Sequence, residues 1–142
     1  YKMSYTKLWV HCVWTTKNRE PFLSDNIRAH VFHHIKENGR IKDIYIDCIN
    51  GYLEHIHCLL SLNRNQTLAN CLQLLKGESS YWINKNKISP FRFAWQDDYY
   101  AESVGHSQIP FVRKYINQQE NHHKKISFQT EYLGFMNMHG FI

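Results

Sequence analysis

Two histidines in the middle of the chain have the spacing of a metal-binding pair. His55 and His57 are separated by one residue within an apolar run that is typical of a strand. Successive side chains of a strand point to opposite faces, so these imidazoles project to one side while Ile56 and Cys58 project to a core. Imidazoles at this spacing can converge on one divalent ion. The alternative is a pair of histidines on the exposed face of a half-buried strand.

A tyrosine closer to the C-terminus is the second group that could do chemistry. The region 109–125 has helical periodicity, which brings residues three, four and seven apart together. One face of this helix would carry Tyr115, Gln118, Gln119 and His122. A tyrosine hydroxyl can attack a phosphate if a metal ion polarises the phosphate and the hydroxyl loses its proton. The alternative is a partly exposed tyrosine on an ordinary amphipathic helix.

The charge and the aromatic content are compatible with a nucleic-acid partner. The formal net charge is +5, and aromatic residues make up 15% of the sequence. Basic side chains can contact phosphates and aromatic rings can stack on bases, although solubility and core packing are the commoner roles. The candidate phosphate contacts are Lys17, Arg19, Lys76, Arg113 and Lys114. The aromatic residues considered for base stacking are Trp82, Trp95, Tyr99 and Tyr100.

The elements that would position these groups follow a β-α-β-β-α-β-α order. The expected strands are 7–16, 44–49, 52–62 and 91–101, and the expected helices are 25–38, 68–82 and 107–124. Ser24 and Thr67 are expected N-caps, Gly39 is expected to end the first helix, and Asn50-Gly51 is a hairpin turn signal. This order predicts an α+β, ferredoxin-like split β-α-β fold. It has a four-stranded antiparallel sheet with helices on one face, plus a C-terminal tyrosine-bearing helix.

The length of 142 residues fits a single domain, in which residues 126–142 form a short helix or a tail. The cysteines are Cys12, Cys48, Cys58 and Cys71, which form no Cys-x-x-Cys pair. This spacing favours buried free thiols in a reducing cytoplasm over a disulfide framework. No apolar run approaches the roughly 20 residues that cross a bilayer, so no membrane partner is expected.

Motifs spread through the chain resemble those of one enzyme family. The motif His55-Ile56-His57, and Tyr115 followed by Gln119, are similar to the histidine motif and the tyrosine helix of the HUH (His-hydrophobic-His) single-tyrosine transposases of small bacterial insertion sequences. Further similar stretches are Trp14–Lys17, Leu74–Ser80 and Trp95–Gly105. The resemblance extends over nearly the whole chain, with the motifs in the order and spacing of the family.

The resemblance implies a specific reaction. Enzymes of this family cut and rejoin single-stranded DNA at the ends of a mobile element, which short imperfect hairpins mark. By resemblance, His55, His57 and Gln119 would hold Mg²⁺ or Mn²⁺ on the scissile phosphate. Tyr115 would be the nucleophile, giving a 5′-phosphotyrosine and a free 3′-hydroxyl. The family also implies a homodimer with composite active sites, in the bacterial cytoplasm and associated with the nucleoid.

Three other functions remain open at this point. A related HUH nickase, such as a mobilisation or replication initiator protein, would share the histidine pair but is usually longer. A domesticated protein that binds hairpin DNA without cutting it is the second. The third is an unrelated ferredoxin-like metal-binding protein, which would have no affinity for single-stranded DNA.

Two positions near the motifs raise further expectations. Glu54 precedes the histidine pair where Asp or Asn is common in the family, and alternation would put it on the core-facing side without an evident partner. Gln118 and His122 share the tyrosine face, so they compete with Gln119 for the place of the third ligand. The neighbouring histidines His122 and His123 are otherwise expected as a pair on the helix surface.

Overall fold

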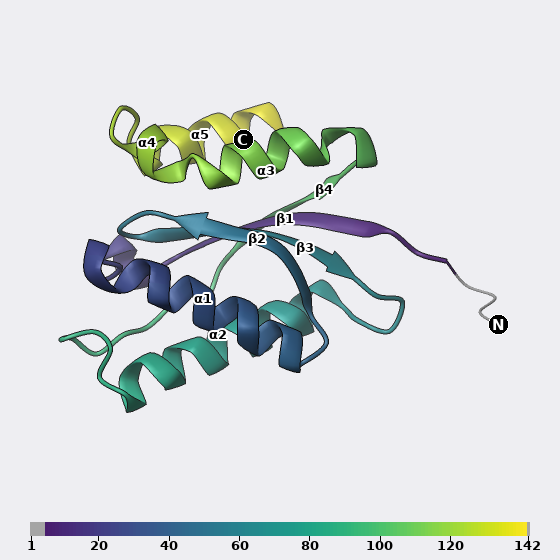
Figure 1. Cartoon of the computed structure of the whole chain (residues 1–142). Coiled ribbons are helices and arrows are strands. Elements are labelled where there is room, and N and C mark those ends of the chain that lie inside the picture. The colour runs from purple at the N-terminus through teal and green to yellow at the C-terminus, as the bar shows by residue number, and fades with distance from the viewer. Residues whose placement is uncertain (1–4, 142) are drawn as a thin grey trace.

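An antiparallel sheet forms the centre of the protein in the computed structural model, which describes residues 5–141. Its strands are β1 (Leu8–Thr15), β2 (Tyr45–Gly51), β3 (His55–Leu62) and β4 (Tyr100–Val104). They lie in the order β2-β3-β1-β4, so β3 and β1 are the central strands (Figure 1). Cys12 of β1 pairs with Cys58 of β3 and with Ala101 of β4, which fixes the register across the sheet.

Helices cover both faces of the sheet. Helices α1 (Asp25–Ile41) and α2 (Leu68–Lys85) lie on one face, and α3 (Ile109–Asn117), α4 (Gln119–His123) and α5 (Phe128–Met138) lie on the other (Figure 1). The predicted α+β, split β-α-β arrangement is therefore confirmed, and the tyrosine-bearing helix takes the face opposite α1 and α2. Within residues 5–141, none of the helices is both long and apolar enough to cross a membrane.

The alternation of β3 divides its side chains between two apolar clusters. Ile56, Cys58 and Leu60 are fully buried in the main core with residues of α1 and α2. Leu59 points the other way and packs with Ile109 and Ile116 of α3. Each fully buried aliphatic side chain contributes about 1.5–3 kcal/mol, so a one-residue shift of β3 would be strongly unfavourable. The same alternation directs the paired histidines toward α3–α5.

The turn between β2 and β3 differs from the one predicted. Gly51 is the last residue of β2 and pairs with Ile56, so the chain reverses at residues 52–54 instead of at Asn50-Gly51. A Cβ atom at Gly51 would lie 2.0 Å from the carbonyl oxygen of His55. Glycine is therefore needed here because two backbones approach closely. Asn50-Gly51 does not form the hairpin turn.

Ser24 and Thr67 are the N-cap residues of the two long helices, as predicted, but Gly39 does not end the first. Thr67 caps α2, because its side chain accepts a hydrogen bond from the backbone N–H of Asn70. Ser24 begins α1 but makes no side-chain cap, since its hydroxyl donates to Asn26. Gly39 lies inside α1, where a Cβ would come within 2.9 Å of Ile46. It therefore permits close packing of α1 on β2 and does not end the helix.

The expected strand 91–101 is mostly irregular, and β4 begins only at Tyr100. The backbone before it bonds partly to the end of β1, where the Gln96 N–H donates to the Thr15 carbonyl at 2.9 Å, and partly to side chains of α2. Asn84 accepts from the backbone N–H of Phe93 and donates to its carbonyl, and Lys76 donates to the carbonyls of Gln96 and Asp97. Side-chain partners therefore replace part of the ladder in this segment, so the regular strand starts only at Tyr100.

The cysteines are free thiols, as predicted. Cys12, Cys58 and Cys71 are buried and Cys48 is half-buried. Burial raises the pKa of Cys12 to about 12, so this thiol stays protonated at neutral pH. The four cysteines therefore act as small apolar side chains of the fold.

Candidate metal and tyrosine site

His55 and His57 are buried side by side beneath the helices α3–α5. Their exposed fraction is 0%, although they lie on the face of β3 that points away from the main core. The alternative of an exposed histidine pair is therefore wrong, because α4 and α5 cover this face. Phe128 of α5 stacks on the His55 ring, with 4.3 Å between the ring centroids.

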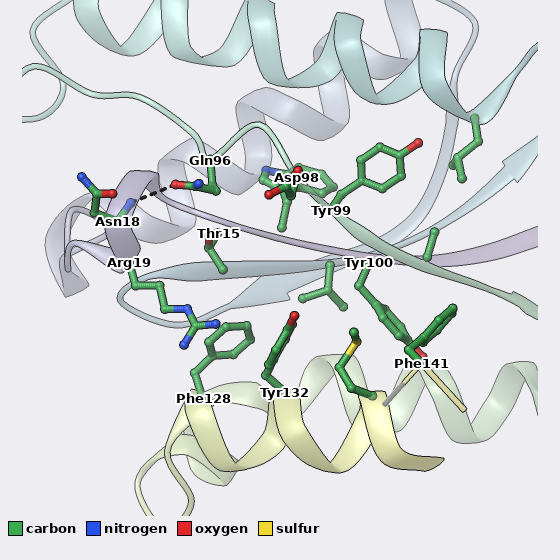
Figure 2. A pocket seen from close by; sticks show the side chains of 15 residues that line it. Thr15, Asn18, Arg19, Gln96, Asp98, Tyr99, Tyr100, Phe128, Tyr132 and Phe141 are labelled. Carbon is green, nitrogen blue, oxygen red and sulfur yellow. Dashed lines mark hydrogen bonds between the residues drawn. The ribbon is translucent and has the colours of Figure 1, made fainter. Parts of the chain in front are cut away.

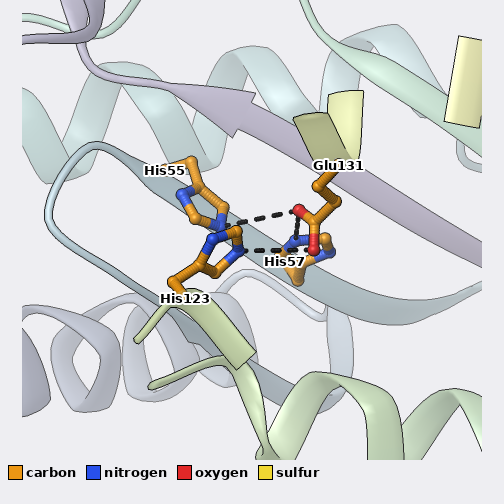
Figure 3. A group of neighbouring side chains, drawn as sticks. All are labelled: His55, His57, His123 and Glu131. Atoms are coloured by element: carbon orange, nitrogen blue, oxygen red, sulfur yellow. Dashed lines mark hydrogen bonds and ion pairs between the residues drawn. The ribbon is translucent and has the colours of Figure 1, made fainter. Parts of the chain in front are cut away.

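Ligand atoms from three elements meet at these histidines. One nitrogen or oxygen atom from each of His55, His57, His123 and Glu131 lies within 4.8 Å of all the others (Figure 3). Two atoms bound on opposite sides of one ion, at about 2.1 Å each, lie roughly 4 Å apart. The ligand atoms would therefore move together by a few tenths of an ångström around one divalent cation, and imidazole nitrogens with a carboxylate are donors that such a cation takes.

Gln119, the third ligand implied by the resemblance, also reaches the cluster. Its Oε1 lies 3.2 Å from His55 Nε2 and 2.9 Å from His123 Nε2, and its side chain is fully buried. Gln118 is exposed on the outside of the helix. The prediction of one continuous helix is wrong at this point, because α3 ends at Asn117 and α4 begins at Gln119. Gln119 faces inward and its neighbour Gln118 faces outward.

Tyr115 contacts the cluster through its hydroxyl group. The hydroxyl donates a hydrogen bond to Glu131 Oε2, and the ring lies 5.5 Å from the ring of His57, centroid to centroid. Gln119 also donates to the backbone carbonyl of Tyr115, which couples the two side chains one helical turn apart. Tyr115 and the histidines belong to the same chain, so this arrangement places the phenol at its own cluster.

Glu131 and His123 are the groups that sequence reasoning missed. Glu131 Oε1 lies 3.0 Å from His57 Nε2 and 3.9 Å from His55 Nε2. Its Oε2 lies 2.9 Å from His122 Nε2 and 3.3 Å from His123 Nε2. The side chain of His123 is only 2% exposed, so the expectation of a surface pair is wrong for this residue. The sequence offered one signal for Glu131. It is a carboxylate in the first turn of a helix that Ser127 caps.

Glu54 holds His55 from the side opposite the cluster. Its Oε1 lies 2.6 Å from His55 Nδ1, which leaves Nε2 facing Gln119. The expected core-facing position of Glu54 is wrong, because β3 begins only at His55 and Glu54 belongs to the turn. Burial alone would raise the pKa of Glu54, but the hydrogen bond and the charge attraction of His55 lower it below its ordinary value. The carboxylate therefore acts as an acceptor that orients a ligand.

His57 is held by a second set of contacts that crosses the sheet. Its Nδ1 lies 2.9 Å from Nε2 of His11 on β1, and His11 Nδ1 lies 3.4 Å from Glu102 Oε1 on β4. His11 and Glu102 are direct cross-strand neighbours, and His11 is 2% exposed. Glu102 also pairs with His139 at 2.6 Å. The order β3-β1-β4 thus places the His11 imidazole and then the Glu102 carboxylate behind His57.

Burial and hydrogen bonds together set the protonation states within the cluster. Burial lowers the pKa of His57 to about 3, so the ring is neutral and has one nitrogen lone pair. Burial would raise the pKa of Glu131, but hydrogen bonds from His123 and His57 hold it well below its usual range. Burial and the hydrogen bond to Glu131 raise the pKa of Tyr115 well above its ordinary value, so the phenol keeps its proton at neutral pH.

The basic residues predicted to contact phosphates have different surroundings. Lys17 and Lys114 are exposed, and the side chain of Arg113 makes a two-point contact with Asp47 at 2.7 and 2.8 Å. Lys76 donates to backbone carbonyls of the segment before β4. The Arg19 guanidinium lies over the rings of two α5 residues, beside the cluster. Tyr99 and Tyr100 line a cavity, whereas Trp95 is buried in the main core.

The fold and the site together define the class of this protein. It is a small α+β protein in which a buried histidine pair on a central strand meets a tyrosine from a covering helix. A family model described as "Transposase IS200 like" matches residues 4–119. The chain belongs to the IS200-like transposase family.

Two solved structures share this fold. A candidate transposase from Deinococcus radiodurans R1 superposes with a TM-score of 0.66 at 18% sequence identity, covering 84% of this chain and 95% of that chain. A REP-associated tyrosine transposase bound to a REP hairpin has a TM-score of 0.65 at 16% identity, covering 89% of this chain and 74% of the other. At such identities the likeness shows the fold alone. A comparison with the curated proteins gives no significant match.

Proposed function

We propose that this protein is a transposase that cleaves and rejoins single-stranded DNA at hairpin-marked element ends. The observation that carries the proposal is the contact between the Tyr115 hydroxyl and a buried cluster of metal-ligating groups. A phenol at a site that can hold a divalent ion is the arrangement that lets tyrosine attack a phosphodiester. Membership of the IS200-like transposase family supports the same conclusion.

The cofactor in this proposal is Mg²⁺ or Mn²⁺. His55, His57 and Gln119 would hold it, and His123 and Glu131 are near enough to take part. When bound, the ion offsets the negative charge of the phosphate oxygens and orients the phosphate. Carboxylate and amide oxygens suit both ions, whereas the imidazole ligands favour Mn²⁺.

Tyr115 is the nucleophile in the proposed reaction. Its Oη forms a bond to phosphorus, the bond from phosphorus to the 3′ oxygen breaks, and that oxygen takes a proton to become a free 3′-hydroxyl. Glu131 Oε2 accepts the hydrogen bond of the phenol, so it is the first acceptor for the phenol proton. The product is a 5′-phosphotyrosine, which retains the phosphodiester, so rejoining to another 3′-hydroxyl needs no ATP.

The proposed partner is a single DNA strand that folds into imperfect hairpins. The REP-associated transposase of similar fold was solved with a hairpin bound, which supports this choice of substrate. We also propose a homodimer with composite active sites in the bacterial cytoplasm. Because Tyr115 contacts its own cluster here, a composite site requires α3 to be exchanged about the segment Val104–His106 that precedes it.

The test is formation of a covalent DNA adduct that depends on a divalent ion. Single strands that carry the hairpins flanking the gene are incubated with the protein, with Mn²⁺ or with EDTA. We expect the protein to become attached to the 3′-labelled fragment and not to the 5′-labelled one, with Mn²⁺ alone. Tight hairpin binding without any adduct would instead support a domesticated DNA-binding protein. Failure to bind single-stranded DNA would contradict the proposal altogether.

A further prediction concerns His11, the positioning residue behind His57. For His57 to offer Nε2 to an ion, its Nδ1–H must donate to His11 Nε2, 2.9 Å away. We expect His11→Leu to weaken Mn²⁺ binding about 10- to 100-fold, as loss of a second contact behind a metal ligand usually does. His11→Gln keeps an acceptor and should lose less. The measurement is Mn²⁺ affinity by calorimetry, together with the His57 tautomer from ¹⁵N NMR.

The matched control for His11 is His33→Leu, which removes an exposed imidazole of α1. This variant should bind Mn²⁺ as the wild type does. Wild-type affinity in a folded His11→Leu protein, with an unchanged His57 tautomer, would show that the contact between the two imidazoles has no positioning role.

A further inference from the structure

A carboxylate on the edge strand β4 is linked to the candidate metal site through two imidazoles. Glu102 Oε1 lies 3.4 Å from His11 Nδ1, and His11 Nε2 lies 2.9 Å from His57 Nδ1. The side chain of His11 is 3% exposed and that of Glu102 is 22% exposed. Water therefore has little access to His11, and each of its ring nitrogens faces one of these two side chains.

The other end of the Glu102 carboxylate is held by the end of α5. Its Oε2 lies 2.6 Å from His139 Nε2, which leaves Oε1 for the contact with β1. The ring of Tyr100 lies 5.9 Å from the ring of His139 and stacks on Phe135 at 5.7 Å, centroid to centroid. Tyr100 and Phe141 lie side by side in the wall of a cavity of about 790 Å³ (Figure 2). These contacts restrict the carboxylate on the side away from the metal site.

The Glu102 carboxylate decides which nitrogen of His11 carries a hydrogen. Burial would raise the pKa of Glu102, but the hydrogen bond from His11 and the charge attraction of His139 lower it below its ordinary value. The carboxylate is therefore ionised at neutral pH, and an ionised carboxylate only accepts hydrogen bonds. Nδ1 of His11 consequently carries a hydrogen, and in the neutral ring Nε2 is then bare.

The state of His11 controls which nitrogen of His57 is available to an ion. A bare His11 Nε2 accepts the Nδ1 hydrogen of His57, and this leaves His57 Nε2 with a free lone pair. Glu131 acts in the opposite sense, because its Oε1 lies 3.0 Å from His57 Nε2 and draws the hydrogen to that nitrogen. Two carboxylates, one at each end, thus compete for the hydrogens of the two rings.

We propose that Glu102 is a positioning residue for the metal site, which keeps His57 Nε2 free for a divalent ion by fixing the tautomer of His11. This inference deepens the proposed function, because it takes His57 as a metal ligand. Partners behind a metal-ligating histidine set its tautomer and strengthen its binding of the metal. Here the support extends two residues behind the ligand, across the neighbouring strands β3, β1 and β4.

The first test is the tautomer of His11 in the metal-free protein, measured by ¹⁵N NMR. We expect His11 Nδ1 to carry a hydrogen in the wild type and to lose it in Glu102→Leu, where the acceptor is gone. Glu102→Gln keeps an acceptor oxygen and should retain the hydrogen on Nδ1. A bare Nδ1 in the wild type, or an unchanged tautomer in a folded Glu102→Leu protein, would overturn the proposal. The wild-type tautomer tests the proposal even if Glu102→Leu does not fold.

The second test is Mn²⁺ affinity, measured by calorimetry. Glu102→Leu should weaken binding about 3- to 10-fold, less than His11→Leu, because one more contact separates Glu102 from the ion. In a His11→Leu background, Glu102→Leu should cause no further loss, since Glu102 acts through His11. An equal loss in both backgrounds would mean that Glu102 only attracts the ion by its charge, and this would contradict the proposal.

The matched control is Glu78→Leu. Glu78 is also a carboxylate paired with a histidine, since its Oε1 lies 2.9 Å from His34 Nε2, and its side chain is 23% exposed. This pair joins α1 to α2 on the other face of the sheet (Figure 1). Glu78→Leu should therefore bind Mn²⁺ as the wild type does and leave the His11 tautomer unchanged.

Neither measurement uses DNA, so failure of this inference differs from failure of the proposed function. If the wild type forms the Mn²⁺-dependent adduct while Glu102→Leu keeps the wild-type tautomer, Glu102 has no positioning role and the proposed function stands. If the tautomer and the Mn²⁺ affinity change as expected but the wild type forms no adduct, Glu102 positions the metal site and the cleavage proposal is wrong.

Discussion

Tyr115→Phe is expected to abolish covalent attachment of the protein to DNA. The substitution removes one oxygen atom, the only atom of this side chain that can form the bond to phosphorus. The ring keeps its contacts with His57 and Phe135, at 5.5 and 5.7 Å between centroids, so the fold should be retained. We therefore expect adduct formation to fall to background, while affinity for the hairpin strand changes little.

The measurement is the yield of protein–DNA adduct on a denaturing gel, with the 3′-labelled strand and Mn²⁺. The matched control is Tyr81→Phe, which removes a hydroxyl from an exposed tyrosine of α2 but leaves an aromatic ring in place. It should form adduct at close to the wild-type level. An adduct formed by Tyr115→Phe at a comparable level would mean that another residue is the nucleophile.

His57→Ala is expected to lower the affinity for Mn²⁺ by more than about 100-fold, beyond the usual effect of losing a contact behind a ligand. The imidazole is fully buried, and its Nε2 lies within the cluster of ligand atoms. The same loss should abolish adduct formation, because the phosphate would be neither oriented nor neutralised. Mn²⁺ affinity measured by calorimetry or by electron paramagnetic resonance tests this, with circular dichroism as the check of folding.

The same titration can rank the remaining ligands. Gln119→Ala and Glu131→Gln should each weaken Mn²⁺ binding, and the larger loss identifies the stronger of these two oxygen ligands. His33→Ala, on the exposed face of α1, is the control that should have no effect. Wild-type Mn²⁺ affinity in a folded His57→Ala protein would contradict the assignment of the cluster as the metal site.

Much of the fold follows from local patterns in the sequence. The alternation of Ile56, Cys58 and Leu60 with the two histidines predicts which side of β3 faces the main core, and the structure confirms it. Local patterns were less reliable at glycines. Gly39 was predicted to end a helix and Gly51 to form a turn. Instead, Gly39 lets α1 approach Ile46 of β2, and Gly51 lets β2 approach the His55 carbonyl of β3.

The sequence by itself determined the order of the elements, the histidine pair on one face of a strand, and the four-residue spacing that puts Tyr115 and Gln119 on one side, although α3 ends between them. These features depend on the periodicities of strands and helices, which are local. Only the tertiary structure decided that the pair is buried and that Glu131, 74 residues from His57, lies beside it. The packing of α5 across the sheet brings them together. Similarly, the strand order β3-β1-β4 places His11 and Glu102 behind His57, which no local pattern encodes.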